Sequence, residues 1–550
     1  MIATRTLPRR ADFPASGSTW RADLIAGITV GVVALPLALG FGIASGVGAA
    51  PGLITAIVAG IVAAIFGGSS LQVSGPTGAM TVVLVPIVAE YGAGMVPVLA
   101  VLAGSMVILS GWLGLGRAVT LIPWPVVEGF TVGIAVIIFL QQVPLILDVP
   151  HAHERNTLTA TLHAVQRADW NAAFPAVILT IAAISMLLAA RRLRPTFPAS
   201  LVAVVTVTLL AVAFKLDVPE IGKLPMSGLV AVPDMPPADT LLKVLPAAGV
   251  IALLAALESL LSARVADGMS DSRPTDPDRE LVGQGLANVA SGMFGGLPAT
   301  GAIARTAVNM RAGAQTRMAA LFHGLVLLVV LLGASRIIAV VPLAALAGVL
   351  MMTAIRMVDR PTCRALLRAD RSDALVFDPT AAMTIVFDLV RAVELGIAVA
   401  AILVLRSTAR ASTVREESVA AHVEHLDDLA VRELLHEHVV VYQLQGSLFF
   451  GAAQRFLEEL TALDEARVVV LRMAGLNVLD ATGAHVLAET VDEFGKRDIA
   501  VLLCGVRPQH RRALRTAGIP GPRLPEAHIY ADLQVALERA RAICHHEPDA

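Results

Sequence analysis

Two segments rich in glycine and hydroxyl residues interrupt apolar stretches of the chain, and their residue types are those that bind anions. The first, LQVSGPTGAM, spans residues 71–80, and the second, GGLPATGAIARTAVNMRAGAQT, spans residues 295–316. Ser74 and Pro76 fit a helix start, because a hydroxyl can cap unpaired N–H groups and proline lacks the N–H that would be unsatisfied there. A helix N-terminus carries positive potential, so both segments predict an anion-binding helix start.

The predicted anion site takes residues from both segments. Arg305 adds a full positive charge about one turn into the second short helix, and a charge at membrane depth is costly and indicates function. Two alternatives remain open. The glycine and serine runs can serve close helix packing alone, and Arg305 can form a structural ion pair with Glu258. The predicted anion-binding residues are Ser74, Gly75, Thr77, Gly78, Gly301, Ala302, Ala304 and Arg305.

Glu258 is a second charge within an apolar stretch, ALLAALESLLSARVADG, which spans residues 252–268. Ser262 follows one helical turn later, on the same helix face. A buried carboxylate beside hydroxyl oxygens can carry a proton or bind sodium. We therefore predict that Glu258 and Ser262 bind a coupling cation, with an internal ion pair or a boundary position for Glu258 as the alternatives. Three other acidic residues lie nearer helix ends and are interpreted as structural: Glu128, Asp388 and Glu394.

The composition places these segments in a membrane protein. The 550 residues would suggest three or four soluble domains by length alone. However, 56% of residues are hydrophobic, the mean hydropathy is +0.73 and only 16% are charged, against about 25% charged in soluble proteins. Charges are sparse from about residue 22 to residue 407 and dense afterwards. The chain is therefore predicted to be a polytopic α-helical membrane protein followed by a soluble domain.

The apolar segments form two sets of seven, with similar spacing in each set. The first helices of the two sets begin near residues 22 and 245, and the two short helices begin near residues 76 and 302. Seven is odd, so the second copy is predicted to be inverted, and short segments interrupted by glycine and proline at matching positions indicate a transporter's substrate site. The predicted helices are 22–45, 51–67, 76–91, 95–115, 121–142, 172–190, 197–214, 245–263, 281–296, 302–312, 318–335, 337–355, 376–389 and 392–407.

The basic residues predict the orientation of these helices. Alternate loops hold most of the arginines, including Arg191, Arg192 and Arg194 in one loop and Arg356, Arg360 and Arg364 in another. Cytoplasmic loops carry an excess of lysine and arginine. We therefore expect both termini in the cytoplasm, in a multi-pass protein of a cell or inner membrane. The first apolar stretch is too long for a signal peptide and is interpreted as a retained helix.

The end of the chain has the pattern of a small α/β domain. HVVVYQL and GSLFFG read as two strands, RVVVLRM and IAVLLC as two more, and helical stretches alternate with them. The predicted organisation is a cytosolic N-terminal segment at 1–20, a transmembrane domain at 21–408, a helical linker at 409–436, the α/β domain at 437–543 and a tail at 544–550.

Other chemistry finds little support in the sequence. Cys363, Cys504 and Cys544 are too far apart to suggest a disulfide framework or a zinc site. The histidines of HAHER (His151, His153) and HEH (His436, His438) stand in polar segments without further clustered ligands and are interpreted as solvated. No catalytic triad, P-loop or GxGxxG motif is found, so neither an enzyme nor a cofactor is expected, apart from a coupled proton or sodium ion. The net charge of −2 gives no indication of a nucleic-acid partner.

Several motifs in order resemble the sulfate permease (SulP) family of anion transporters: RADLIAGITVGVVALPLALGFGIASGVGAAPGL, VSGPTGAM, ELVGQGLANVASGMFGGLPATGAIARTAVNMRAGAQT and NVLDATGAHVL. The resemblance covers nearly the whole chain. ALESLLSARVADGM is also similar to a dicarboxylate-transporting branch of bacterial members. The resemblance implies fourteen helices in core and gate domains, an elevator motion, a STAS domain in the cytosol and a homodimer.

The resemblance also assigns residues. It places the anion between the third and tenth helices, at Thr77, Ala304 and Arg305, and the cation-coupling carboxylate at Glu258. Leu37 stands where many relatives carry Gln or Glu, and Ala304 replaces a hydroxyl found in some. Both departures leave room for an organic carboxylate as well as for sulfate or bicarbonate. In the STAS domain, Thr482 matches a phosphorylatable position, and the alternative is a helix cap only.

The sequence thus predicts secondary active uptake of a small anion, by symport with protons or sodium. The alternatives are an uncoupled anion exchanger or channel, and a membrane sensor that signals through the STAS domain to a cytosolic partner. The predicted inverted repeats and the opposite intramembrane charges favour the carrier.

Overall fold

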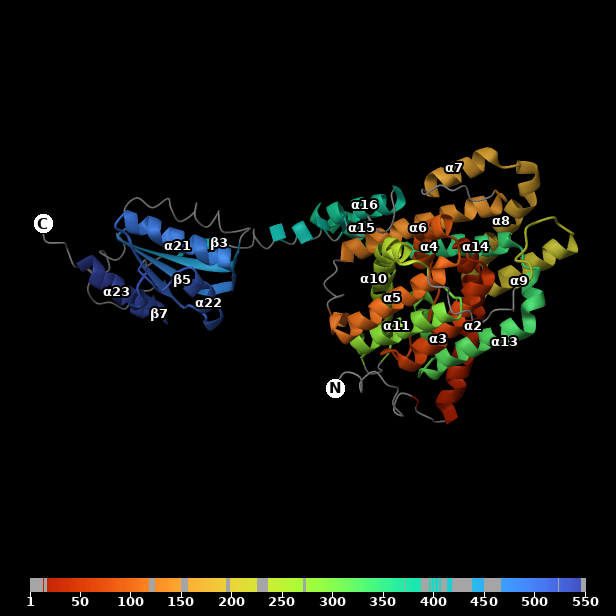
Figure 1. Cartoon of the computed structure of the whole chain (residues 1–550), viewed down its shortest axis with the longest axis horizontal. Helices are drawn as coiled ribbons and strands as arrows, with labels where there is room; N and C mark the ends of the chain where they lie inside the picture. The colour runs from red at the N-terminus through yellow and green to blue at the C-terminus, as the bar shows by residue number, and fades with distance from the viewer. Residues whose placement is uncertain are drawn as a thin grey trace. The chain divides into compact units, whose positions relative to one another are not determined.

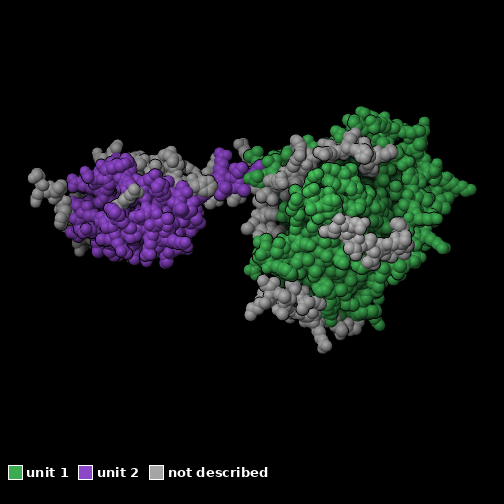
Figure 2. All heavy atoms as spheres, in the orientation of Figure 1, with its two compact units in different colours: residues 1–398 green, residues 399–550 purple. Residues whose placement is uncertain are grey.

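A computed structural model of the chain shows two compact units, residues 1–398 and 399–550, which are described separately (Figure 2). The structure describes residues 13, 17–117, 124–149, 157–193, 198–224, 236–270, 274–369, 371–386, 395–396, 398–399, 401–403, 405–406, 413–417, 438–449, 466–522 and 524–545. Asp388, Glu394, His151, His153 and His436 lie outside these residues, as does most of the predicted helix 392–407.

The unit formed by residues 1–398 is called the membrane unit. Its first half consists mainly of apolar helices (Figure 1). An apolar helix of about 20 residues spans a bilayer, because every backbone N–H and C=O group is paired within it. Between α6 and α8 lies α7, an amphipathic helix that the hydropathy pattern did not predict. The helices are α2 (Gly17–Ala44), α3 (Ala49–Phe66), α4 (Gly78–Tyr91), α5 (Met95–Trp112), α6 (Trp124–Ile146), α7 (Thr157–Arg167), α8 (Trp170–Leu193) and α9 (Ala199–Ala213).

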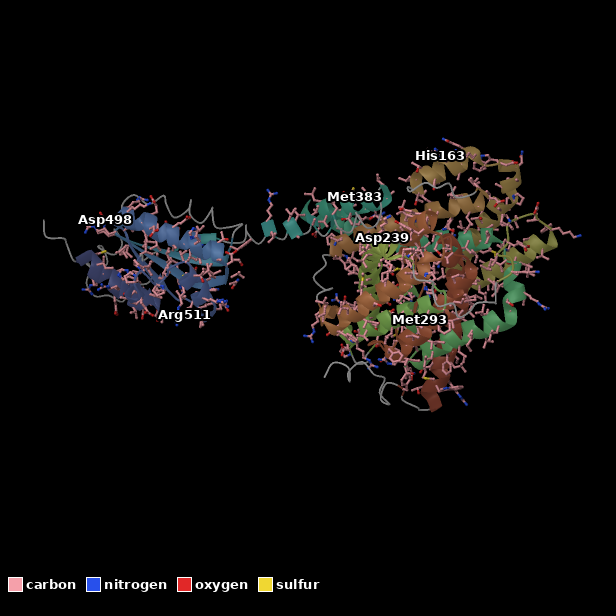
Figure 3. The ribbon with its side chains drawn as sticks, viewed as in Figure 1. His163, Asp239, Met293, Met383, Asp498 and Arg511 are labelled. Carbon is pink, nitrogen blue, oxygen red and sulfur yellow. The ribbon has the colours of Figure 1, made fainter. Side chains whose placement is uncertain are left out.

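The second half continues the same pattern. Among the described residues, seven helices of the chain are long and apolar enough to cross a membrane, and α4 and α9 are shorter apolar helices. Figure 3 labels Asp239, in the first turn of α10, and Met293, the last residue of α11. A short amphipathic helix, α15, was not predicted. The helices are α10 (Ala238–Gly268), α11 (Pro277–Met293), α12 (Ile303–Arg311), α13 (Met318–Ala339), α14 (Leu343–Met357), α15 (Arg360–Ala369) and α16 (Arg371–Val386).

Two very short strands precede the two short helices. β1 (Ser74–Gly75) leads into α4 and β2 (Thr300–Gly301) leads into α12, and the strands pair antiparallel, with Ser74 opposite Gly301 and Gly75 opposite Thr300. This pairing brings the two predicted anion-binding segments together although they lie more than 220 residues apart. Every N–H and C=O group in a membrane interior needs a partner, so the strand pair makes non-helical backbone possible there.

Small residues allow the helices around the strand pair to approach closely. Figure 1 shows α3, α5 and α11 side by side in the membrane unit. A Cβ atom on Gly104 of α5 would lie 2.7 Å from the carbonyl oxygen of Gly285 on α11, and one on Gly285 would lie 2.6 Å from the carbonyl oxygen of Gly104. Backbone contact of this kind is how small residues join helices in a membrane. These helices therefore form a firm support for β1 and β2.

The second unit contains a five-stranded sheet in the order β3-β4-β5-β6-β7. β3 pairs antiparallel with β4, and the other neighbouring strands are parallel. α21 (Ala481–Lys496) and α22 (Arg511–Thr516) cover one face and α23 (Leu533–His545) the other, each over its own apolar core. The strands are β3 (Thr413–Glu417), β4 (Val439–Leu448), β5 (Val468–Leu479), β6 (Ala500–Cys504) and β7 (Ile529–Tyr530).

Three local predictions in this unit are wrong. Residues 413–417, predicted within a linker helix, form β3 at the sheet edge. HVVVYQL and the first residues of GSLFFG contribute to one strand, β4 (Val439–Leu448), because Gly446 has a φ of 92° and produces a register irregularity without ending the strand. β5 continues through Leu479, where NVLDATG was read as a loop. In each case pairing with a neighbouring strand decides the outcome, and the local sequence does not show it.

Candidate functional site

The N-termini of α4 and α12 both leave backbone donors available beside the strand pair. Thr77 is the N-cap of α4 and Ala302 is the N-cap of α12, and neither makes a side-chain capping hydrogen bond. Their carbonyls accept the first helical bonds, from the N–H groups of Thr81 (3.2 Å) and Thr306 (2.8 Å). The N–H groups of the first turn of each helix therefore have no intrahelical partner. Such donors, with the positive ends of two helix dipoles, favour an anion.

Ser74 does not cap the helix as the sequence predicted. It lies in β1, three residues before the N-cap, and its hydroxyl accepts a hydrogen bond of 2.5 Å from the side-chain amide of Gln284 on α11. The same amide nitrogen donates to the carboxylate of Glu280 (2.9 Å), which also accepts from the N–H groups that precede β1, at Gly68 (2.8 Å) and Ser69 (2.9 Å). Ser74 therefore anchors β1 to α11.

Glu258 connects the two helix starts through hydroxyl groups. Its Oε2 accepts hydrogen bonds from Thr77 (2.8 Å) and from Thr300 (2.6 Å), and the two hydroxyl oxygens are 3.3 Å apart. Thr300 is fully buried, whereas Glu258 and Thr77 are half-buried. One carboxylate oxygen and two hydroxyl oxygens thus lie within hydrogen-bond range of one another. Hard cations prefer oxygen ligands of this kind, and the same carboxylate can take up a proton.

Arg305 lies beneath the strand pair and is almost fully buried, at 2% exposure. Its Nη2 donates to the carbonyl oxygen of Pro76, and its Nη1 has no hydrogen-bond partner among the described residues. Neither Arg305 nor Glu258, both within the described part of the chain, has the other among its bonded partners. The alternative of a direct structural ion pair therefore finds no support, and the guanidinium has one nitrogen left for a ligand.

Gly75 is required where Arg305 passes β1. A Cβ atom at this position would lie 2.3 Å from Nη1 of Arg305 and 3.4 Å from the Cα atom of Ala56 on α3. Gly301 is packed as tightly, because its Cβ atom would lie 1.8 Å from the side-chain nitrogen of Gln72. Larger residues would displace the groups that form the site, so these glycines act by allowing close approach.

Ser262 lies apart from the Glu258 cluster. Its hydroxyl pairs with that of Thr306 at 2.9 Å, and Thr306 accepts from the N–H of Val73 at 3.1 Å. The neighbouring Ser259 accepts from the N–H of Gly301 at 2.9 Å. These bonds attach β1 and β2 to α10 and α12. The predicted pairing of Ser262 with Glu258 around one cation is thus not the arrangement in the structure, since the two side chains have different partners.

Apolar residues from other helices border the helix starts. A Cβ atom on Gly78 would lie 2.2 Å from Cδ1 of Ile138 on α6 and 3.4 Å from the ring of Phe41 on α2. Ala302 is buried, whereas Ala304 is exposed in the first turn of α12. Leu37 is buried on α2 at 8% exposure. Polar groups therefore come from β1, the start of α4, β2, α10 and α12, and the bordering side chains on α2 and α6 are apolar.

Four residues of this network were not predicted from the sequence: Thr300, Ser259, Thr306 and Gln284. Each is a polar residue within the predicted membrane domain, which is the one signal that could have found it. Sequence spacing alone did not show that Ser259 and Ser262 have different partners, because it does not indicate which helix face lies against which neighbouring segment.

The remaining predicted sites lie elsewhere. Thr482 is exposed in the first turn of α21, and the helix is capped by Asp480, whose side chain accepts from the N–H of Gly483 at 2.7 Å. Thr482 is therefore not the cap. In the part of the chain that the structure describes, no three His, Cys, Asp or Glu residues are grouped so as to hold a metal ion. Cys504 and Cys544 are buried in the core beneath α23.

Comparisons with known proteins agree with the fold. Residues 20–380 match the sulfate permease family and residues 433–536 match the STAS domain. The chain is 34% identical over 511 residues to the putative sulfate transporter YvdB of Bacillus subtilis (strain 168), covering 91% of this chain and 94% of that protein. It is 32% identical over 539 residues to the bicarbonate transporter BicA of a Synechocystis species, covering 94% of each.

Two solved structures are similar to this one. The transmembrane domain of a cyanobacterial BicA has a TM-score of 0.62 at 32% identity, covering 69% of this chain and 98% of that chain. The murine anion transporter Slc26a9 in its inward-facing state has a TM-score of 0.85 at 16% identity, covering 98% of this chain and 94% of that chain, and shows the fold alone.

The fold and the matched relatives together define a multi-pass membrane transporter, and not an enzyme. The chain belongs to the sulfate permease family of anion transporters and carries a C-terminal STAS domain.

Proposed function

We propose that this protein is a secondary active carrier of a small oxyanion, with bicarbonate as the first candidate and sulfate or a C4-dicarboxylate as the others, driven by a proton or a sodium ion that enters with it. The observation that carries the proposal is the convergence of two helix N-termini, the free Nη1 of Arg305 and the hydroxyl-bound carboxylate of Glu258 around one strand pair. The chain's similarity to transporters named for bicarbonate and sulfate supports this range of substrates.

In this mechanism the anion takes the unpaired N–H groups at the start of α4 and α12 together with Arg305. The cation takes the oxygens of Glu258, Thr77 and Thr300 on the other side of the strand pair. The hydroxyl hydrogen bonds of Thr77 and Thr300 hold the empty carboxylate. A sodium ion would take their oxygen lone pairs in place of these bonds, and a proton would bind the carboxylate itself.

The charge of the site favours a singly charged anion. Arg305 and Glu258 carry opposite charges, so the empty site has no formal net charge. One bicarbonate and one monovalent cation leave the net charge of the site at zero, whereas the doubly charged sulfate needs a second cation. Moving net charge through a low-dielectric interior is costly, and a neutral loaded site can cross more easily than a half-loaded one.

The transport cycle is proposed to follow the elevator motion expected for the family. We infer fourteen helices in two inverted repeats of seven, in which α4 and α12 hold matching positions. The antiparallel pairing of β1 and β2 supports an inverted relation between the two copies. We infer that both termini lie in the cytoplasm, an orientation that the arginine-rich loops support, and a homodimer is expected.

The STAS domain is proposed to regulate transport from the cytosol, through a protein partner or through phosphorylation of Thr482. Thr482 is exposed in the first turn of α21. A phosphate there would add about two negative charges at a helix N-terminus, where the dipole stabilises them.

The experiment is uptake of labelled bicarbonate and sulfate into proteoliposomes under an inward sodium gradient, an inward proton gradient, or neither. Protein-free liposomes give the leak of carbon dioxide. Accumulation of one anion above equilibrium under one gradient is the expected result. Glu258→Gln is expected to let the anion equilibrate across the membrane but not accumulate, because the variant lacks the negative charge that binds the cation. Glu128→Gln on α6 is the matched control, since Glu128 lies near a helix end and is expected to keep accumulation.

The other outcomes identify the alternatives. Tracer that only equilibrates, or that needs internal anion, would indicate a channel or an exchanger and would remove the coupling role of Glu258. A protein that moves no tracer would be a sensor.

A further inference from the structure

His323 is a buried ionisable residue that neither the anion site nor the cation site uses. It lies in the second turn of α13, is 0% exposed, and neither ring nitrogen has a hydrogen-bond partner among the described residues. A neutral imidazole has one donor and one acceptor, and burying both unpaired is unfavourable. An apolar side chain would fill the same space without that cost, so packing alone does not account for a histidine here.

The imidazole faces the back of β1 across a glycine of α3. A Cβ atom on Gly60 would lie 3.6 Å from Nδ1 of His323 and 3.4 Å from the carbonyl oxygen of Ser74. One turn earlier on α3, the Cα atom of Ala56 would lie 3.4 Å from a Cβ atom on Gly75, which in turn would contact Arg305. Residues four apart lie on one helix face. His323 and Arg305 therefore approach the same strand, from the same side of α3.

Other polar atoms around the strand pair also have no protein partner. They are both side-chain polar atoms of Gln72, Oε1 of Gln284 and Nη1 of Arg305, all buried and all within the described residues. Gln72 lies against Gly301 of β2, and Gln284 donates to Ser74 of β1. Buried polar groups in proteins are paired with protein or with internal water, and such water is held by polar groups that have no other partner.

The charged groups near His323 are few. α3 contains no titratable residue. Asp23 on α2 accepts hydrogen bonds from the N–H groups of Gln315 and Thr316, just before α13. At the start of α13, the guanidinium of Arg317 donates to the carbonyl oxygens of Ala64 and Gly67. Arg305 on α12 reaches the same strand, where its Nη1 would lie 2.3 Å from a Cβ atom on Gly75. The remaining charged residues of α2 and α13 are Arg21, which is exposed, and Arg336, in the last turn of α13.

We propose that His323, with water held between its ring and the Ser74 carbonyl in the space in front of Gly60, is a proton-binding site coupled to the anion site. When the anion site is empty, the positive charge of Arg305 opposes a proton on the imidazole. An anion at Arg305 offsets that charge, so anion and proton favour each other's binding, and the coupling is reciprocal. The protonated ring then donates through the water to the Ser74 carbonyl. This site rests on the proposed anion site, and it is separate from Glu258.

The test measures proton uptake on anion binding, without any gradient. Purified full-length protein is titrated calorimetrically with formate, which has the planar shape and single charge of bicarbonate and stays ionised between about pH 6 and 8. Two buffers with different ionisation enthalpies give the number of protons taken up per formate bound. The unaltered protein is expected to take up a measurable fraction of about one proton, and its formate affinity is expected to fall by up to about tenfold per pH unit as pH rises.

Two variants test the site by different routes. His323→Gln removes the titrating group while keeping a polar side chain, and its formate affinity is expected to vary less with pH. Gly60→Ala keeps the histidine and places a methyl group at ordinary contact distance from Nδ1 and from the Ser74 carbonyl, so the helix is kept while the water is excluded. Proton uptake is expected to fall in both. Gly333→Ala on α13 is the matched control, because a Cβ atom there meets nothing within 4 Å.

The outcomes separate this site from the proposed function. Formate binding with the same proton uptake in His323→Gln and Gly60→Ala would overturn the histidine site and leave the anion site intact. Absence of formate binding to the unaltered protein would overturn the anion site, and the histidine site with it. Loss of proton uptake in both variants, with binding kept and Gly333→Ala unchanged, would establish the site.

Discussion

Replacing Thr300 by valine tests how the carboxylate of Glu258 is held, and it distinguishes the two coupling ions. Valine has nearly the shape of threonine and removes only the hydroxyl that donates to Oε2 at 2.6 Å. Thr77 still donates at 2.8 Å, so the carboxylate keeps one of its two hydroxyl donors. The buried position of Thr300 makes solvent replacement of the lost bond unfavourable.

A hydrogen bond to a charged group contributes about 1.5–3 kcal/mol. If the proton is the coupling ion, the variant carboxylate holds the proton more tightly, and the pH of half-maximal uptake rises by about one to two units. If sodium is the coupling ion, an oxygen ligand is lost, and the sodium concentration for half-maximal uptake rises by about 10- to 150-fold. The two ions thus give changes in different measured quantities.

The assay is initial uptake of labelled bicarbonate by proteoliposomes, against external pH at fixed sodium and against sodium at fixed pH. Thr208→Val on α9 is the matched control, because that buried hydroxyl donates only to the carbonyl of Val204 within its own helix, at 2.8 Å. Thr300→Val with unchanged dependence on both ions, in a protein as stable as the control, would refute the role of this hydrogen bond and weaken the assignment of Glu258.

Two further predictions concern the anion site and the STAS domain. Gly75→Ala is expected to raise the KM for the anion at least tenfold, because the added Cβ atom would lie 2.3 Å from Nη1 of Arg305. The control Gly94→Ala is expected to leave KM unchanged, because its Cβ atom would meet nothing within 4 Å. Equal KM values in the two variants would contradict the position of Arg305. Burial raises the pKa of the Cys504 thiol from 9.0 to about 11, so the folded state holds this proton more tightly than the unfolded state. The contribution of this group to the free energy of unfolding is therefore present below pH 9 and is lost as pH rises towards about 11. Mass spectrometry after iodoacetamide treatment at about pH 8 is expected to find Cys504 unmodified until the domain unfolds, and rapid modification of the native protein would be inconsistent with this burial.

Much of the fold was predictable because few backbone structures can span a bilayer. Each predicted segment from 22–45 to 376–389 overlaps a helix of the structure, since a long apolar run in a membrane must pair its own backbone groups. The sequence pattern missed α7 and α15, whose mixed polarity has no clear hydropathy signal. The apolar run IAVLLC predicted β6 at its observed position. In contrast, β3 depends on its neighbour β4, because an edge strand is determined by pairing with residues distant in sequence.

The candidate site was predictable in its ingredients and not in its connections. Arg305, Glu258 and Thr77 were identified because charges and interrupted helices are rare within apolar segments. Which hydroxyl holds Glu258 was not predictable: Ser262 lies one turn along the same helix, yet the partner is Thr300, 42 residues away. Helical spacing specifies neighbours within a helix, and it says nothing about the side chain that a second helix brings opposite.

Sequence alone was sufficient to predict a polytopic membrane protein with two interrupted helix starts, an intramembrane charge of each sign and an α/β domain at the end of the chain. Composition and periodicity are sufficient for this, because they reflect what each segment must exclude from lipid or expose to water. The packed structure was needed to see that β1 and β2 pair, that Ser74 anchors a strand instead of capping a helix, and that His323 lies behind that strand. These features depend on contacts between residues far apart in the chain, and such contacts exist only once the helices have packed.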